Sequence, residues 1–319
     1  MSEIRYSRGL SLRQVIARGL GVMVIVAVFV LMGEGIVEAG PLTPLAFLLA
    51  LLLLLANLLG YVELAVSGRR RGSAYSQVQE AEDGWLAFLT GWTLVLSGLG
   101  MCTLLARGLG LQITTLLRDH LDLALPVWPL TVGSVVLLAV NNALGTREGR
   151  RSLVTAFLVL TVVLIGFILL AVPHIDLGNY AGGPRDWRQA LTILMASFVG
   201  LEVTASLQHE MEYRRHSSPQ ALLLTPVLAA LVGALIAFVV VGVVGPVAWT
   251  DSGPPLAMLG SNVARGAGRP LILAVGALAL AVAFNSAFVL VVRQVYAMSK
   301  DGYWPSGLLH AHRRFGTPI

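Results

Sequence analysis

The sequence predicts an all-α integral membrane protein with eight transmembrane helices. Of its 319 residues, 56% are hydrophobic, only 12% are charged, and the apolar residues gather in eight long runs. A soluble domain carries about 25% charged residues, so a single water-soluble core cannot absorb this much apolar sequence. A soluble enzyme is therefore excluded. The net charge of +5 does not indicate a nucleic-acid partner, because the basic residues lie at the ends of the apolar runs.

Each apolar run is long enough to cross a hydrocarbon layer of roughly 30 Å as a helix of about 20 residues. We expect eight spans, at 14–37, 42–66, 85–110, 128–144, 152–172, 188–211, 222–247 and 270–297. No small-residue cleavage site follows the Arg-rich start, so we expect no removable signal peptide. The 34 glycines are scattered through the spans, where small residues allow helices to pack closely. The whole chain, 1–319, is therefore expected to form a single transmembrane domain.

The distribution of basic residues predicts the orientation. With a cytoplasmic N-terminus, sixteen Lys and Arg residues lie in inner segments and five in outer segments, with Arg107 left over. Cytoplasmic loops of membrane proteins carry the excess of basic residues. We therefore expect a protein of the cell (inner) membrane, with the segments 1–13 and 298–319 both on the cytoplasmic side. Tryptophans at the span ends are interpreted as anchors at the level of the lipid headgroups: Trp85, Trp128, Trp187 and Trp249.

Glu202 is the most informative charged residue within a span. It lies midway along 188–211, directly after Gly200 and Leu201. An ionisable side chain at membrane depth costs at least about 2.5 kcal/mol, so such a residue is a candidate for a binding site. Two interpretations stay open: the carboxylate faces a ligand cavity, or it only caps or packs a broken helix.

Three further charged residues are candidates for gating or coupling. Arg107 lies 22 residues after Trp85, a rise of about 33 Å, which favours a side chain that reaches the outer interface. Glu63 lies near the inner end of its span, where either a structural ion pair or an inner gate is expected. Glu210 ends 188–211 beside His209, and the pair is interpreted as a solvated cap or as a proton shuttle.

The sequence contains no pattern that indicates catalysis, a metal or a cofactor. The six histidines lie mostly in loops or at span ends, without HExxH spacing. The single cysteine, Cys102, lies in an apolar run, which excludes an intrachain disulfide and a cysteine-based zinc site. Gly19-Leu20-Gly21 lies in a span without a preceding strand, so it is not a dinucleotide fingerprint. We therefore expect a protein that is not an enzyme and that binds no cofactor.

Several local patterns occur in one order along nearly the whole chain. They are Val28-Phe29-Val30-Leu31-Met32-Gly33-Glu34, Tyr61-Val62-Glu63-Leu64, Gly72-Ser73-Ala74-Tyr75, Trp85 with Gly91-Trp92, Leu96-Ser97, Ala106-Arg107, Phe198-Val199-Gly200-Leu201-Glu202, and Arg293 through Gly302 with Arg314-Phe315-Gly316-Thr317-Pro318. With this ordered set the sequence resembles the amino acid-polyamine-organocation superfamily of permeases, and within it most resembles the cationic amino acid transporter branch.

The resemblance implies a five-plus-five inverted repeat, with 14–172 as the first repeat and 188–297 as three helices of the second. The first and sixth spans are then broken at mid-membrane, so that half-helix ends and free backbone groups meet an amino acid or amine substrate. Transport would proceed by alternating access. The implied substrate-binding residues are Gly21, Val22, Ile25, Val26 and Ala27 in the first span, Phe198, Val199, Gly200 and Glu202 in the sixth, Ser97 in the third, and Asn285 and Ser286 in the eighth.

The chain departs from the family pattern in three places. Ile25 and Ala27 stand where the family has glycine, which favours a more continuous first span. No residue of 152–172 is charged, whereas proton-coupled relatives carry a lysine there. The sequence ends where a ninth span would begin, so a truncated chain, or a second polypeptide that supplies the remaining helices, is expected. The alternative to a transporter is therefore a transport-incompetent membrane protein that acts as an interaction or regulatory partner, or one part of a split transporter.

Overall fold

A computed structural model of the chain describes residues 10–67, 74–81, 84–143, 152–208, 211, 214–245, 254–264, 266–305 and 307. Within these ranges the backbone is helical or connects helices, and the only pairing of strand type is an isolated bridge between Leu10 and Met211. The predicted all-α fold is confirmed.

The predicted spans coincide with helices of the structure. These are α1 (Leu12–Val26), η1 (Ala27–Leu31) and α2 (Met32–Ala39) for the first span, α3 (Thr43–Ser67), α5 (Gly84–Leu121), α6 (Val127–Ala143), α7 (Ser152–Ala171), α8 (Trp187–Met195), η5 (Ala196–Gly200) and α9 (Leu201–Leu207) for the sixth, α10 (Arg214–Val244) and α12 (Gly268–Lys300). The largest difference is at the outer end of α5, which continues to Leu121 instead of ending near residue 110.

Six helical stretches of the described residues are long and apolar enough to cross a membrane. The first, Leu12–Glu63, has 52 residues, or about 78 Å of helix, which is more than twice the hydrocarbon thickness. Gly40 divides it, because its φ of 57° lies in the left-handed region and reverses the chain before α3. Together with the shorter α6, the helices account for a multi-pass membrane protein.

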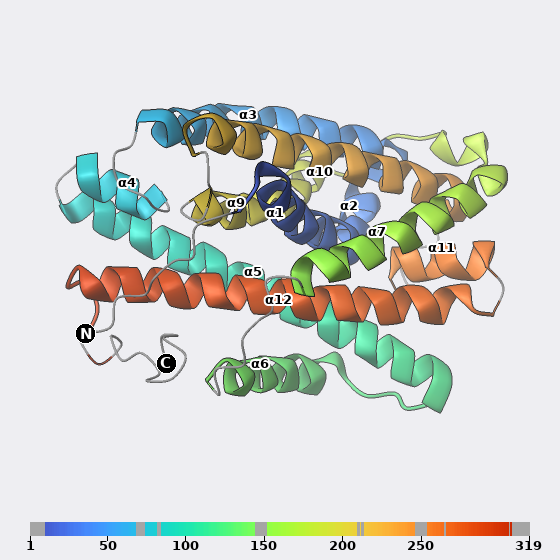
Figure 1. Cartoon of the computed structure of the whole chain (residues 1–319). Helices are drawn as coiled ribbons and strands as arrows, with labels where there is room; N and C mark the ends of the chain where they lie inside the picture. The colour runs from blue at the N-terminus through green and yellow to red at the C-terminus, as the bar shows by residue number, and fades with distance from the viewer. Residues whose placement is uncertain are drawn as a thin grey trace.

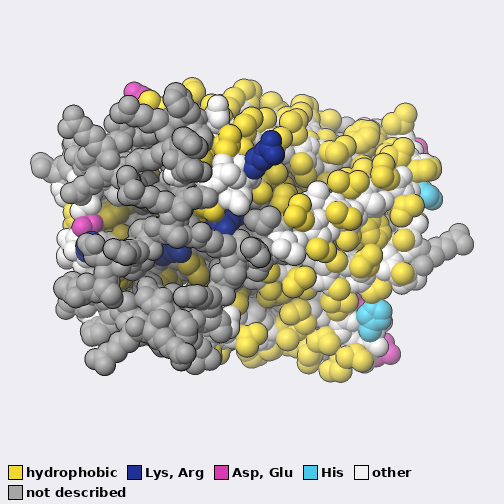
Figure 2. Space-filling model, in the orientation of Figure 1, with side chains coloured by type: hydrophobic (Ala, Val, Ile, Leu, Met, Phe, Trp, Pro, Cys, Tyr) yellow, Lys and Arg dark blue, Asp and Glu magenta, His cyan; other side chains and the backbone are white. Residues whose placement is uncertain are grey.

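The outer surface of the helices is apolar. In Figure 2, hydrophobic side chains cover most of the surface that belongs to described residues. Leu137 of α6 and Val162 of α7 are each 70% exposed, and many leucines of α3, α5 and α10 are exposed as well. Soluble monomers rarely expose contiguous apolar patches of more than a few hundred Å². The surface is therefore the expected one for a protein surrounded by lipid tails.

α1 forms the centre of the helix bundle (Figure 1). Val22 to Val26 are at most 2% exposed, although a capping box between Ser11 and Gln14 begins the helix in an exposed turn. α3 packs along α10 on one side of α1, and α5 packs along α12 on the other, with α6 outside α5.

Two short helices were not predicted. α4 (Ala74–Ala81) follows α3 at its inner end and packs on the start of α5, and α11 (Pro255–Val263) precedes α12 and packs on its first turns. The close approach of α11 depends on two glycines, because a Cβ at Gly268 would lie 2.2 Å from the carbonyl oxygen of Gly260. Short 3-10 turns, η3 (Val172–His174) and η4 (Leu177–Tyr180), lie in the connection between α7 and α8.

Candidate functional site

A cavity lies between α5, α12 and the sixth span. Together with its mouth it encloses about 380 Å³ that no atom occupies. α5 contributes Leu94, Ser97, Gly98 and Met101, η5 and α9 contribute Val199, Glu202 and Ser206, and α12 contributes Leu290, Val291 and Gln294. Small-molecule sites are commonly apolar hollows with a few polar groups that converge, and this lining has that composition.

Glu202 supplies the acidic group of the cavity. Its Oε1 accepts a hydrogen bond from the hydroxyl of Tyr61 on α3, and Glu202 begins α9 at its second position. The bond joins the second and sixth predicted spans beside the cavity. Both interpretations of Glu202 are thus represented: the carboxylate lines a cavity and also holds two helices together.

The expected breaks of the first and sixth spans take the form of changes in helix type. α1 passes into the π-helical turn η1 at Ala27, and α8 passes into the 3-10 turn η5 at Ala196. Neither span contains an unwound segment among the described residues. The physical reason in the first span is that Ile25 and Ala27 have less backbone freedom than glycine, which favours a continuous helix. π-helical turns are frequent at functional sites, but this one begins at Ala27, the last of the residues expected for the site in the first span, so the expected break stays a prediction.

The predicted binding residues of the first span do not line this cavity. Val22 and Ile25 are fully buried, and Val26 and Ala27 are each 2% exposed. Gly21 is buried against the ring of Phe157 on α7, because a Cβ added to Gly21 would lie 3.3 Å from the nearest ring atoms. The first span therefore packs behind the sixth instead of opening toward the hollow.

The predicted residues of the sixth span are divided. Val199 and Glu202 line the cavity, whereas Phe198 and Gly200 are buried on the side of the core. Gly200 lies against α1, because a Cβ there would be 3.2 Å from the backbone nitrogen of Met23.

The helix α12 contributes different residues from those expected. Asn285 is buried and accepts a 2.6 Å hydrogen bond from the amide of Asn142 on α6, and the hydroxyl of Ser286 donates to the carbonyl of Val282. Neither lines the cavity. Leu290 and Gln294 line it instead. Because they follow Ser286 by four and eight residues, they continue its helical face one and two turns toward the inner end. This helical spacing from Ser286 is the feature of the sequence from which Leu290 and Gln294 could have been predicted.

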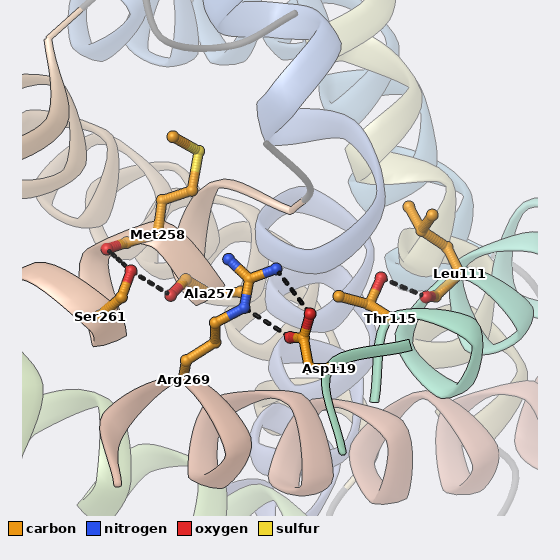
Figure 3. Close-up of polar contacts among 7 residues, drawn as sticks. All are labelled: Leu111, Thr115, Asp119, Ala257, Met258, Ser261 and Arg269. Carbon is orange, nitrogen blue, oxygen red and sulfur yellow. Dashed lines mark hydrogen bonds and ion pairs between the residues drawn. The ribbon is translucent and has the colours of Figure 1, made fainter. Parts of the chain in front are cut away.

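The third span brings Ser97 to the cavity together with Met101, one turn further along the same face. The position of this wall is fixed by contacts between α5 and α12. Where α5 ends and α12 begins, Arg269 donates from Nε to Asp119 Oδ2 over 2.6 Å and from Nη2 to Oδ1 over 3.4 Å, as Figure 3 shows. Such a two-pronged guanidinium–carboxylate pair fixes orientation as well as distance.

The opposite ends of the same two helices, where α5 begins and α12 ends, meet in an aromatic cluster. The hydroxyl of Tyr75 on α4 donates a 2.7 Å hydrogen bond to Asp301 just after α12. The rings of Trp92 and Trp304 are stacked at 4.9 Å, and Tyr303 packs edge-on against Tyr75. Burial raises the pKa of Tyr75 well above its ordinary value, and the bond to Asp301 raises the same pKa further. α4 is thereby attached to α5 and α12.

Two of the gating candidates, Arg107 and Glu63, lie in described helices and do not line the cavity. Arg107 is exposed, and its Nη1 lies 3.8 Å from Glu34 Oε1 of α2. Glu63 is exposed near the inner end of α3. Glu210 and its neighbour His209 lie outside the described residues.

The described residues contain no group of three or more histidine, cysteine, aspartate or glutamate side chains placed to hold a metal ion. Cys102 is buried in α5. The chemistry of the site is therefore that of one carboxylate, two hydroxyls and an amide in an apolar wall.

Comparison with known proteins yields a family and several relatives. A family model described as amino acid permease matches residues 10–319. The branched-chain amino acid permease BcaP of Bacillus subtilis is 22% identical, over 94% of this chain and 69% of its own length. Human cationic amino acid transporter 4 is 28% identical, over 99% of this chain but 53% of its own length. The methylthioribose transporter of Bacillus subtilis is 23% identical over 98% of this chain and 72% of its own length. The chain thus spans between about half and about 70% of the length of these relatives.

Proposed function

The chain belongs to the amino acid permease family, and from this membership and the cavity at Glu202 we propose that it is a secondary transporter. It moves an amino acid or a related organic cation across the cytoplasmic membrane by alternating access. The observation that carries the proposal is a partly buried carboxylate in a hollow between two groups of helices.

The first group is built around α1 and the sixth span. A Cβ at Gly19 would lie 1.9 Å from Thr204 Oγ1 of α9, so these helices approach too closely to slide past each other. Tyr61 adds α3 to the group through its hydrogen bond to Glu202. We call α1, α3, α9 and the helix α10 that packs on α3 the core group.

The second group consists of α5 and α12, which we call the scaffold pair. The Asp119–Arg269 ion pair joins the outer ends of these helices, and the aromatic cluster of Tyr75, Trp92, Tyr303 and Trp304 joins their inner ends. The cavity lies between the core group and the scaffold pair. Rocking of one group against the other would open the cavity to each side of the membrane in turn, which is the physical content of alternating access.

The coupling mode follows from the charges of the fifth span. No residue between Ser152 and Val172 is ionisable, so an amine in this span is not available to carry a proton. The proposal is therefore exchange or facilitated movement, or coupling through Glu202 itself.

Uptake into proteoliposomes tests the proposal. The 319-residue chain is purified, reconstituted, loaded with unlabelled compound and offered the same compound in labelled form, for a panel of amino acids and amines. Counterflow above that of empty liposomes is expected for at least one compound, and it should fall in Glu202→Gln. A panel without any counterflow or binding would refute the transporter and would favour the interaction partner, including a part of a split transporter that needs a second polypeptide.

The orientation of the chain in the membrane is tested separately, by labelling cysteines that are added one at a time to a chain that keeps its native cysteine. Cys102, the single cysteine, is buried, so it should react poorly with a membrane-impermeant maleimide. Gly183→Cys in the exposed connection before α8 should be labelled on intact cells, and Lys300→Cys at the end of α12 only after the cells are opened. The reverse pattern would contradict the cytoplasmic placement of both ends.

A further inference from the structure

The lining of the cavity contains an acidic residue and, among the described residues, no basic one. Glu202 is the acidic residue, and none of the described residues that line the cavity is basic. The other polar groups are the hydroxyls of Ser97 and Ser206 and the amide of Gln294. Hydroxyl and amide oxygens accept hydrogen bonds from an ammonium group.

Within the part of the chain that the structure describes, no basic side chain forms an ion pair with Glu202. Its polar contact there is the hydroxyl of Tyr61, and the ion pairs Arg107–Glu34 and Arg269–Asp119 involve other carboxylates. An ionised carboxylate that is removed from water without a cation is costly. A ligand ammonium in the cavity would supply the missing charge.

The structure offers no comparable place for a ligand carboxylate in the first span. In α1 and η1 the backbone N–H groups are bonded within the helix, as for Ala27, whose N–H donates to the carbonyls of Met23 and Val24. The side chains of Ile25 and Val26 also shield this segment, with at most 2% exposure.

The sixth span is equally closed to an anion. The N–H of Leu201 donates to the carbonyls of Phe198 and Val199, and the N–H of Ala196 donates to carbonyls of α8. A ligand carboxylate that entered the cavity would meet the carboxylate of Glu202, and no basic side chain among the described lining residues would offset the repulsion between like charges.

We propose that the ligand of this cavity is an aliphatic amine that carries no carboxylate, an inference that rests on the proposed function. Its ammonium pairs with Glu202 and donates to Ser97, Ser206 or Gln294. Its aliphatic part packs on the apolar wall, which consists of Leu94, Met101, Val199, Leu290 and Val291.

Matched pairs of compounds that differ only in the carboxylate test the inference. The apparent Kd of the purified full chain is measured from ligand-induced shifts in thermal unfolding, for isoamylamine against leucine, cadaverine against lysine, and agmatine against arginine. In at least one pair the amine should bind about tenfold to a hundredfold more tightly, the range for one charge-assisted hydrogen bond. If the amino acid binds as tightly as its amine or more tightly in every pair that binds, the inference is wrong and the transporter proposal stands. If no compound binds and none is transported, both are wrong.

Three variants separate the cavity from other carboxylates. Glu202→Gln should weaken amine binding about tenfold or more, while Glu38→Gln at the outer end of α2, outside the cavity lining, should leave it unchanged. Should Glu202→Gln fail to fold, Gln294→Lys keeps Glu202 and places a competing cation in the cavity, so it should remove most of the preference for the amine. An unchanged preference in that folded variant would overturn the inference.

Discussion

The contact between Gly19 and Thr204 gives the sharpest prediction about how the helices move. Gly19 of α1 faces Thr204 of α9, and a Cβ added to Gly19 would lie 1.9 Å from Thr204 Oγ1 and 3.0 Å from Thr225 Cγ2. Ordinary van der Waals contacts of a Cβ begin near 3.4 Å. In Gly19→Ala the Thr204 side chain must therefore rotate away or one of the helices must shift, and the Thr204 Cβ at 3.2 Å keeps the contact tight in either case.

Overpacking of this kind costs about 1–3 kcal/mol. For a chain longer than 150 residues each kcal/mol corresponds to roughly 2–4 °C in Tm, so Gly19→Ala should lower the apparent Tm by about 5 °C in detergent. Thermal unfolding followed by tryptophan fluorescence measures the shift. The matched control is Gly133→Ala in α6, where a Cβ would meet nothing within 4 Å. Its Tm should stay constant or rise, since alanine favours helix over glycine by about 1 kcal/mol.

A second substitution identifies the contact. The hydroxyl of Thr204 is buried without a hydrogen-bond partner among the described residues, so Thr204→Ala alone should cost little. In the double variant the nearest Thr204 atom is the Cβ at 3.2 Å, and most of the lost stability should return. If the two effects simply add, the side chains do not touch and the rigid contact between α1 and α9 is refuted.

Three further variants probe the remaining contacts. Tyr61→Phe leaves Glu202 without its hydrogen bond and should lower the apparent Tm by a few degrees, for a loss of about 1–3 kcal/mol; an unchanged Tm would argue against the bond. Asp119→Asn should lower the free energy of unfolding by about 1 kcal/mol or less in low salt, because the pair with Arg269 is partly exposed. The difference in stability from wild type should shrink in about 1 M salt, and a difference that does not change with salt would contradict an ion pair. The phenol of Tyr75 stays protonated in the folded chain, because its pKa is raised there. In the unfolded chain it ionises near pH 10. Its contribution to stability is therefore present below about pH 10 and falls as the pH rises above that value. Tyr75→Phe should therefore lose less Tm between about pH 9 and 11 than wild type, and equal losses would exclude this role.

The positions of the helices could be predicted because membrane thickness sets their length. Apolar runs located the spans to within a few residues at most ends. The outer end of α5 was missed since Arg118, Asp119 and His120 have the composition of a loop, whereas the structure continues the helix and uses Asp119 to hold Arg269. Composition does not reveal such a partner, which lies 150 residues away in the sequence.

The short helices could not be predicted for a related reason. α4 and α11 have eight and nine residues, too few to cross a bilayer or to give a clear helical period. Both are stabilised by contacts with helices distant in sequence, as with the hydrogen bond from Tyr75 to Asp301.

The site was predictable in part. Glu202 stood out as an ionisable residue in an apolar span, whereas Ser97 was implied by the resemblance to permeases, and both line the cavity. Leu290 and Val291 did not stand out, because their apolar side chains look like any others that face lipid or a neighbouring helix. The π-helical turn after Val26 is likewise invisible in a run of valine, alanine and phenylalanine, since packing and not composition decides which carbonyl accepts each bond.

The central claim is that the core group and the scaffold pair are two bodies that move about a ligand cavity. Spin labels on Leu59 of α3 and Leu96 of α5, which are 63% and 60% exposed on the inner halves of their helices, report the separation of the two bodies in a Cys102→Ala background. Pulsed electron resonance gives the distance distribution of the chain in nanodiscs, alone and with saturating cadaverine or lysine, whichever binds. The account predicts that the ligand redistributes the population between a shorter and a longer distance. A single distribution that stays the same while the ligand is bound would contradict it.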